Sequence, residues 1–292
     1  MRLADKTHKT ILIVEGNHEG LVSKTPQGNP HGAAEHYGAV LHQLDSQLRL
    51  VVTRPHFTSD PAGPVNWPDI DGVVFTGAGV YWSADASEAA PARKVMEAAF
   101  SHHLPVFGSC YGMQLGVAVL GGRMQANPAG PEIAIARDIQ INDEGQSHLL
   151  YHHKPHRFDA LCMHRDDVLD IGAQLCVLSS NAHCAVQAVA ATAQDICFWG
   201  VQYHPELHFR DIAGYLERSD IDGFAKTTGA IGLSAPPDLS LAEIIADFRA
   251  LDKLGATAPY KERYNLSSGL MRRDIHEIEL SNWVASIACQ VK

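Results

Sequence analysis

Hydrophobic positions in the first part of the chain form short continuous runs, separated by stretches with helical spacing. The continuous runs are residues 11–15, 50–52, 72–75 and the stretch that ends at Gly108. Between them, apolar residues recur at helical spacing from Ala34 to Leu48, and residues 88–102 also fit a helix. Apolar strands alternating with helices are typical of a parallel sheet that is covered by helices on both faces.

The pattern changes after Gly121 and Gly122. Short runs of strand type follow without long helices between them, at residues 132–141, 175–178, 184–189 and 196–201. They predict a partly antiparallel extension of the sheet. Beyond Leu207 the spacing becomes helical, at residues 210–217, 241–254 and 270–289. We therefore expect an α/β domain over residues 1–208 and a helical C-terminal extension over residues 209–292 that packs on it.

One strand-to-helix junction carries a reactive side chain. From Leu104 the chain reads LPVFGSCYGMQ, with Cys110 between Gly108 and Gly112 and a helical run from Met113 onward. Gly-x-Cys-x-Gly has the form of a nucleophile elbow with cysteine in the usual serine position. Such a turn strains its central residue and places the sulfur at a helix N-terminus, which favours the thiolate. Because a lone cysteine can also be structural, a second motif is needed.

The second motif is the segment GVQYHPE, residues 200–206. An apolar strand leads to His204, and Glu206 follows two residues later, with Pro205 stiffening the link. Residues two apart in an extended segment point the same way, so the carboxylate can hold the imidazole. Cys110, His204 and Glu206 thus supply a nucleophile, its base and the group that orients the base.

Together the two motifs resemble those of the class I glutamine amidotransferase family, and the resemblance covers roughly residues 11–208. It implies a flavodoxin-like fold: a mixed, mostly parallel sheet with helices on both faces and the active site at the C-terminal ends of the strands. It also implies a substrate with a γ-glutamyl amide. The cysteine thiolate would attack the amide carbon, and the resulting γ-glutamyl thioester would be hydrolysed to glutamate.

The resemblance implies an oxyanion hole. Residues 76–79, Thr-Gly-Ala-Gly, stand where the family has a Gly-Gly-Pro type turn, so the backbone N–H of Ala78 would be one donor and Gly77 would adjoin the substrate. The N–H of Tyr111, just after the nucleophile, would be the other donor. Two aimed donors contribute roughly 3 kcal/mol each.

Three further residues are expected to contact the substrate. Gln114 lies four residues past the nucleophile, where the family uses a glutamine. His164 and Arg165 belong to Met163-His164-Arg165-Asp166, which stands where the family often has a Ser-His-Gly-Asp-like segment. Arg165 replaces a glycine there and could pair with a substrate carboxylate.

Composition narrows the class of protein. The 292 residues are 46% hydrophobic, enough for a substantial core, and the formal charge of −10 argues against a nucleic-acid or anionic-membrane surface. Apolar runs are too short for a membrane span, and residues 1–10 lack a signal-peptide core. The six cysteines show no Cys-x-x-Cys pair, so we expect reduced thiols in the cytoplasm. Despite 17 histidines, we expect no metal and no cofactor.

The sequence favours a stand-alone hydrolase. There is no Gly-rich phosphate loop with Lys-Ser/Thr, so the chain either serves a separate synthetase or acts alone. The helices after Leu207 could wall the site, and Tyr81 and Trp82 could line apolar room for an amine leaving group. Some members of the family cleave N-substituted γ-glutamyl amides, such as γ-glutamylanilide or γ-glutamyl alkylamides. We expect that reaction here.

Two alternatives stay open. The first is a glutaminase subunit that hydrolyses glutamine and supplies ammonia to a separate synthetase. The second is a catalytically silent binding or regulatory protein on the same fold, which the intact triad disfavours. A glutamine-synthetase-like enzyme upstream in the pathway and a homo-oligomer are the candidate partners beyond the small-molecule substrate.

Overall fold

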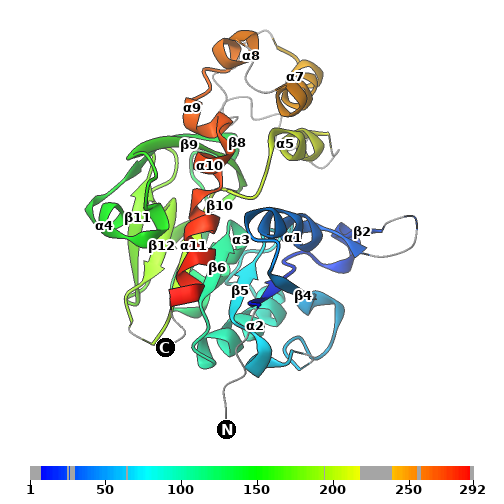
Figure 1. Ribbon diagram of the computed structural model, residues 1–292, viewed down its shortest axis with the longest axis vertical. Coiled ribbons are helices and arrows are strands. Elements are labelled where there is room, and N and C mark those ends of the chain that lie inside the picture. Colours follow the sequence, from blue (N-terminus) through cyan, green and yellow to red (C-terminus); the bar gives the residue numbers. More distant parts are fainter. Residues whose placement is uncertain are drawn as a thin grey trace.

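A mixed β-sheet with helices on both faces forms the body of the molecule (Figure 1). The computed structural model describes residues 8–24, 26, 30–63, 65–193, 195–217, 239–254 and 258–289. In these residues the main sheet has nine strands in the order β4-β1-β5-β6-β13-β12-β11-β8-β9. The predicted fold class, with helices at the C-terminal end of the chain, is confirmed.

The parallel half of the sheet is built from the continuous apolar runs. Its strands pair in parallel and are β4 (Arg49–Thr53), β1 (Thr10–Val14), β5 (Gly72–Phe75), β6 (Val106–Ser109) and β13 (Phe198–Val201). Every residue of the last four is buried. Burial on both faces explains why their sequences do not alternate between polar and apolar residues.

The other half of the sheet is antiparallel, as expected. It consists of β12 (Ala188–Ala191), β11 (Leu175–Ser180), β8 (Glu132–Ile141) and β9 (Arg157–His164). The predicted run at 184–189 forms a strand only from Ala188. The edge strand β9 was not predicted, because the polar residues Arg157, Asp159 and His164 stand among its apolar positions. A short helix, α4 (Asp143–Ser147), lies against β11.

Two small antiparallel pairs complete the strands. In one of them β7 (Arg123–Ala126) pairs with β10 (Asp166–Asp170), and in the other β2 (Ser23–Lys24) pairs with β3 (Pro30–His31). The first pair matters for the site, because β10 begins at Asp166, the last residue of the Met163–Asp166 segment.

Each face of the sheet has its own helices. On one face, α1 (Ala33–Leu44) and α11 (Ile278–Cys289) share a core with apolar residues of β1, β5 and β6. On the other face, α2 (Ala90–Ser101) and α3 (Tyr111–Val119) pack against the alternate residues of the same strands. The helix α1 ends at Leu44, earlier than the spacing predicted, because Asp45 is extended and caps the helix with its N–H on the Leu41 carbonyl.

The predicted helix over 270–289 is wrong as a single element. The chain instead forms α9 (Ser268–Met271), α10 (Arg273–His276) and α11, with an extended backbone at Arg272. The breaks serve long-range hydrogen bonds: the His276 ring donates to the Leu207 carbonyl at 2.8 Å, and Lys154 donates to the Ile275 carbonyl at 2.8 Å. Helical spacing alone cannot reveal such tertiary bonds.

The C-terminal helices contact two different parts of the sheet. The helices α5 (Phe209–Leu216), α7 (Leu241–Leu254) and α8 (Ala258–Arg263) belong with α9 to a cluster on β8 and β9. They form the upper part of Figure 1, whereas α11 runs down over the sheet. The predicted boundary at residue 208 stays a prediction. Among the described helices, none is both long and apolar enough to cross a membrane.

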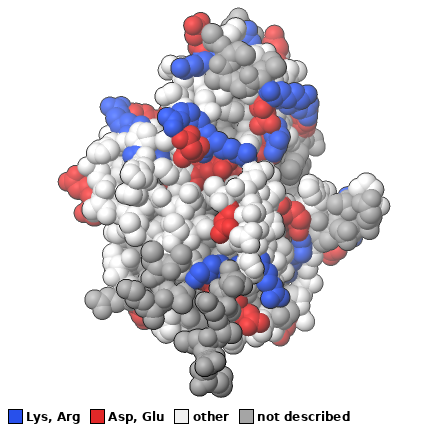
Figure 2. All heavy atoms as spheres, in the orientation of Figure 1, with Lys and Arg blue, Asp and Glu red and all other residues white. Residues whose placement is uncertain are grey.

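Charged side chains of both signs are interspersed on the face shown in Figure 2. Exposed ion pairs among the described residues include Arg157 with Asp138 and Arg249 with Glu217. The expectation that neither nucleic acid nor a membrane binds this chain remains a prediction.

Candidate active site

Cys110 lies at a sharp turn between β6 and α3. Its backbone has φ 51° and ψ −107°, a region that side chains with a Cβ rarely adopt, and its N–H donates to the Val201 carbonyl at 2.7 Å. The neighbouring glycines allow this packing, because a Cβ on Gly112 would collide with the Phe75 backbone and one on Gly108 with Gly112 itself. The strained elbow expected from the sequence is therefore present, with Cys110 just C-terminal to a buried strand.

His204 and Glu206 follow β13, the strand beside β6. The two side chains meet with His204 Nδ1 2.7 Å from Glu206 Oε1. The His204 N–H donates to the Leu161 carbonyl at 2.8 Å, which fixes the backbone. On its other side the ring packs against Gly77, where a Cβ would come within 2.5 Å of His204 Cε1. The turn predicted for the oxyanion hole thus lies directly against the imidazole.

The buried groups around Cys110 form one electrostatic unit. Burial disfavours the imidazolium of His204, but the charges of Glu206 and Cys110 outweigh it and raise the pKa of His204 to about 10. Burial likewise opposes ionisation of Glu206, yet His204 lowers the pKa of that carboxyl below its usual value. The arrangement therefore favours the imidazolium form of His204, held against the Glu206 carboxylate.

The Met163–Asp166 segment borders the nucleophile. Cys110 Sγ lies 3.6 Å from the Met163 carbonyl oxygen. The His164 side chain, however, is turned into the protein, with Nε2 2.9 Å from Glu132 Oε2 and Nδ1 3.3 Å from Asp167 Oδ1. Although burial acts in the opposite direction, these two carboxylates raise the pKa of His164 to about 10. Since both ring nitrogens of His164 have partners within the protein, a contact of its side chain with substrate remains a prediction that the structure does not favour.

Arg165 is already paired within the protein. Its Nε and Nη2 donate to the two carboxylate oxygens of Asp166 at 2.8 and 2.9 Å. Its Nη1 donates to the Tyr81 carbonyl at 3.0 Å. The side chain therefore ties the segment beside Cys110 to the loop that follows the oxyanion turn, and a substrate carboxylate would have to compete with Asp166.

Gln114 is buried and also supports this segment. Its amide nitrogen donates to the Asp166 carbonyl at 2.9 Å and to Gln202 Oε1 at 3.1 Å. These bonds connect α3 with β10 and with the residue two before His204. A direct contact with substrate remains a prediction.

The oxyanion turn is held by Thr76. Its hydroxyl accepts the Gly16 N–H at 3.0 Å and donates to the Gly77 carbonyl at 2.9 Å. The N–H of Tyr111 is at the first position of α3, where backbone N–H groups have no partner within the helix. Both features suit the predicted donors at Ala78 and Tyr111, whose role remains a prediction.

The aromatic residues after the turn differ in their surroundings. Trp82 Nε1 donates to the Tyr111 hydroxyl at 3.1 Å, and the indole lies 5.6 Å from the rings of both His18 and His56. Tyr81, by contrast, is 68% exposed. Trp82 is therefore connected to the residue beside Cys110, whereas the Tyr81 ring faces solvent.

Several residues that hold the site were not predicted. They are His36, Tyr37, Ser109, Glu132 and Gln202. Ser109 adjoins the nucleophile and could have been considered for that reason. Gln202 belongs to the GVQYHPE motif, but its partner Gln114 is distant in sequence. His36, Tyr37 and Glu132 lie far along the chain from their partners, and no motif links them to the triad.

Two side-chain groups in the described part of the chain have metal-ligand chemistry. They are His36 with His208 and Asp211, and His164 with Asp167 and Cys184. The absence of a metal stays a prediction.

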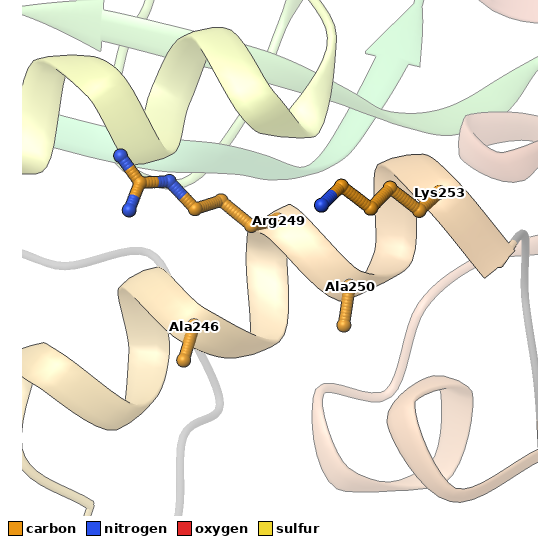
Figure 3. A pocket seen from close by; sticks show the side chains of 4 residues that line it. All are labelled: Ala246, Arg249, Ala250 and Lys253. Carbon is orange, nitrogen blue, oxygen red and sulfur yellow. The ribbon is translucent and has the colours of Figure 1, made fainter.

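A surface hollow lies on the helix α7 (Figure 3). Four residues on one face of the helix line it: Ala246, Arg249, Ala250 and Lys253. It has no residue in common with the candidate site.

The elbow, the His204–Glu206 pair and the mixed sheet define a class of protein. The sequence pattern of glutamine amidotransferase class-I matches residues 40–218. The chain belongs to this family.

Similarity to individual proteins supports this family assignment. The chain is 29% identical, over 72% of its length and 71% of the other's, to a γ-glutamyl-L-1-hydroxyisopropylamide hydrolase of a Pseudomonas species. It is 33% identical to a glutamine-hydrolyzing GMP synthase of Aeromonas hydrophila, over 41% of its own length and only 24% of the synthase. In fold, it is similar to a glutamine amidotransferase from Thermotoga maritima, with a TM-score of 0.63, 12% identity and coverage of 96% and 98% of the two chains.

Proposed function

We propose that this protein hydrolyses an N-substituted γ-glutamyl amide to glutamate and an amine. The observation that carries the proposal is the buried His204–Glu206 pair, 2.7 Å apart, beside a cysteine in an elbow conformation. Such an arrangement can supply a thiolate nucleophile and a proton donor for the leaving amine. The similarity to a γ-glutamyl-L-1-hydroxyisopropylamide hydrolase over most of both chains supports the substrate class.

The proposed reaction has two halves. The Cys110 thiolate attacks the amide carbon, and the N–H groups of Ala78 and Tyr111 stabilise the developing oxyanion. His204 then gives its proton to the nitrogen as the C–N bond breaks, which releases the amine and leaves a γ-glutamyl thioester. In the second half His204 takes a proton from water, the hydroxide attacks the thioester, and glutamate leaves as the Cys110 thiolate is restored.

A substituted amide is ranked ahead of glutamine because of Trp82. Its indole, bonded to the Tyr111 hydroxyl, offers an apolar surface next to the residue that follows the nucleophile. Each methylene of an amine that is buried there contributes about 0.8 kcal/mol. Because the Tyr81 ring is largely exposed, we assign it a smaller part in this surface.

The proposal is tested with a substrate panel. Glutamine, γ-glutamylanilide and several γ-glutamyl alkylamides are incubated with the pure protein, and both glutamate and amine are measured. A substituted amide should exceed glutamine in kcat/KM by about 10- to 100-fold. Cys110→Ala should lower turnover by about 10⁴-fold or more. Should glutamine be the best substrate and a synthetase raise its hydrolysis, the ammonia-supplying alternative replaces this one.

The assignment of Trp82 has a matched control. Trp82→Ala should reduce the preference for a bulky amide more than it reduces glutamine hydrolysis, because only the former uses the indole surface. Trp67 is also partly buried and stacks on His102 at 5.2 Å, but it belongs to a short 3-10 helix, Trp67–Asp69. Trp67→Ala should leave the preference unchanged. Equal effects of the two substitutions would contradict a role for Trp82 in binding the amine.

A further inference from the structure

The carboxylate of Glu206 has a second partner besides His204. Ser109 Oγ lies 3.0 Å from Glu206 Oε2, while His204 occupies Oε1. The Tyr37 hydroxyl in turn lies 3.0 Å from Ser109 Oγ. Glu206, Ser109 and Tyr37 are each no more than 3% exposed, so solvent does not compete for these bonds.

The direction of the hydrogen bonds follows from the number of protons. An ionised carboxylate only accepts, so the Ser109 hydroxyl must donate its single proton to Glu206 Oε2. Ser109 Oγ is then left as an acceptor, and the Tyr37 hydroxyl must donate to it. The chain Tyr37–Ser109–Glu206 therefore has one orientation and ends on a negative charge. Each bond in such a chain polarises and strengthens the next.

Helix α1 holds Glu206 at two points. Tyr37 reaches the carboxylate through Ser109, and the adjacent His36 has Nε2 2.9 Å from the Glu206 carbonyl oxygen. With both carboxylate oxygens occupied, the carboxylate cannot turn without losing a bond to His204 or to Ser109. The orientation of the imidazole is thereby linked to a helix on one face of the sheet.

We propose that Ser109 and Tyr37 are positioning residues, which orient the Glu206 carboxylate and, through it, the His204 imidazole toward Cys110. This inference rests on the proposed function. It assigns a role to the residue before the nucleophile, where an aliphatic side chain could pack but could not donate a hydrogen bond.

Loss of the Ser109 hydroxyl should change the pH dependence of kcat/KM in a definite direction. The Ser109 hydroxyl stabilises ionised Glu206, so its loss raises the pKa of that carboxyl and moves the acidic limb of kcat/KM to higher pH. The titratable groups that interact with Glu206 are His204, His36 and Tyr37 of α1, and His276 of α10. Two more act at one remove, Cys110 on His204 and Glu279 of α11 on Tyr37. All of them remain in a Ser109 variant.

The test compares Ser109→Ala with a matched substitution. Ser179 is also buried, and its Oγ lies 2.7 Å from the hydroxyl of buried Tyr151, but it does not contact Glu206. Ser109→Ala should lower kcat about tenfold or more, change KM less than about twofold, and raise the acidic limb by about one pH unit. Tyr37→Phe should act in the same direction but more weakly. Ser179→Ala should lower the stability by about as much as Ser109→Ala does, but it should change neither kcat nor the pH of the acidic limb of kcat/KM.

A second measurement needs no substrate. The rate of Cys110 alkylation by iodoacetamide is followed against pH by mass spectrometry of the cysteine peptide. The pH profile of the alkylation rate should lie at higher pH for Ser109→Ala than for the wild type and for Ser179→Ala. If Ser109→Ala and Ser179→Ala behave alike in both measurements, the positioning role is overturned. If the wild type cleaves no amide at all, the proposed function fails and the alkylation profile still decides the role of Ser109.

Discussion

At the scale of single residues, the contact between Gly77 and His204 shows how little space the site leaves. A Cβ at position 77 would lie 2.5 Å from His204 Cε1, far inside van der Waals contact. The imidazole would have to move, and a displacement of about 1 Å in a catalytic group can cost about 100-fold in rate.

Gly77→Ala should therefore lower kcat/KM about 100-fold while the protein still folds. Steady-state kinetics and the thermal unfolding midpoint would be measured together. Gly214→Ala is the control, because a Cβ there meets nothing within 4 Å and alanine favours the helix α5. Wild-type kinetics for Gly77→Ala would mean that the ring does not depend on this contact.

The residues that could be predicted are those whose chemistry is local in the sequence. Cys110 lies between its two glycines, and Glu206 is two residues from His204, so each motif is complete within one short segment. The partners of Gln114 come from β10 and from the segment after β13, and one partner of Arg165 is the distant Tyr81 carbonyl, so sequence spacing carries no signal for these bonds. The other partner of Arg165 is the adjacent Asp166, but adjacency alone does not show that the two side chains pair. The structure accordingly gives both side chains protein partners where the resemblance suggested substrate contacts.

At the scale of elements, a buried ion pair joins helix α11 to the connection that precedes β9. Lys154 Nζ lies 2.9 Å from Oε1 of Glu279 in α11, and both side chains are at most 2% exposed. The same oxygen accepts the hydroxyl of Tyr203, the residue before His204, at 2.6 Å. Removing one member of a buried pair leaves an uncompensated charge.

Lys154→Met should lower the free energy of unfolding by about 3–5 kcal/mol. Arg157, three residues further along, forms an exposed pair with Asp138, and Arg157→Met should cost less than about 1 kcal/mol. Urea unfolding midpoints of both variants and the wild type would be compared. Similar midpoints for the two variants would show that Glu279 gains no stabilisation from Lys154.

The strands of the parallel half were predictable because their apolar runs are continuous, and the helices between them because their apolar residues recur at helical spacing. Two features elsewhere were missed, the antiparallel strand β9 and the breaks on either side of α10, which depend on tertiary hydrogen bonds and on side chains that serve the site. His164, for example, ends β9 and is paired with Glu132 of β8, so function places a charged pair inside a strand. Periodicity cannot separate such a strand from a loop.

At the scale of the whole molecule, stability should depend on pH through His276. Burial, together with the charge of Lys154, lowers the pKa of His276 to about 3. Since the unfolded chain takes up a proton near pH 6.5 and the folded chain does not, this residue destabilises the fold as the pH falls below about 6.5.

Between about pH 7.5 and 5 the loss from His276 should be about 2 kcal/mol. His276→Gln removes the titrating group and keeps a donor for the Leu207 carbonyl, so its unfolding free energy should fall less steeply over this range. The exposed His31→Gln serves as the control for chemical denaturation at each pH. If the unfolding free energies of the wild type and His276→Gln fell equally between these pH values, His276 would not be the cause of the loss.

The position of α11 has a consequence for synthesis on the ribosome. Leu280, Trp283 and Ile287 share a core with Ile11 and with residues of the central strands, and Ile287 and Trp283 pack over Gly72. The strands that this helix covers emerge from the exit tunnel long before the helix does. During translation one face of the nascent sheet therefore lacks the part of its cover that α11 supplies, and apolar residues there stay accessible until the helix emerges. Completion of the fold must wait for α11, so the nucleophile is made long before it can become active.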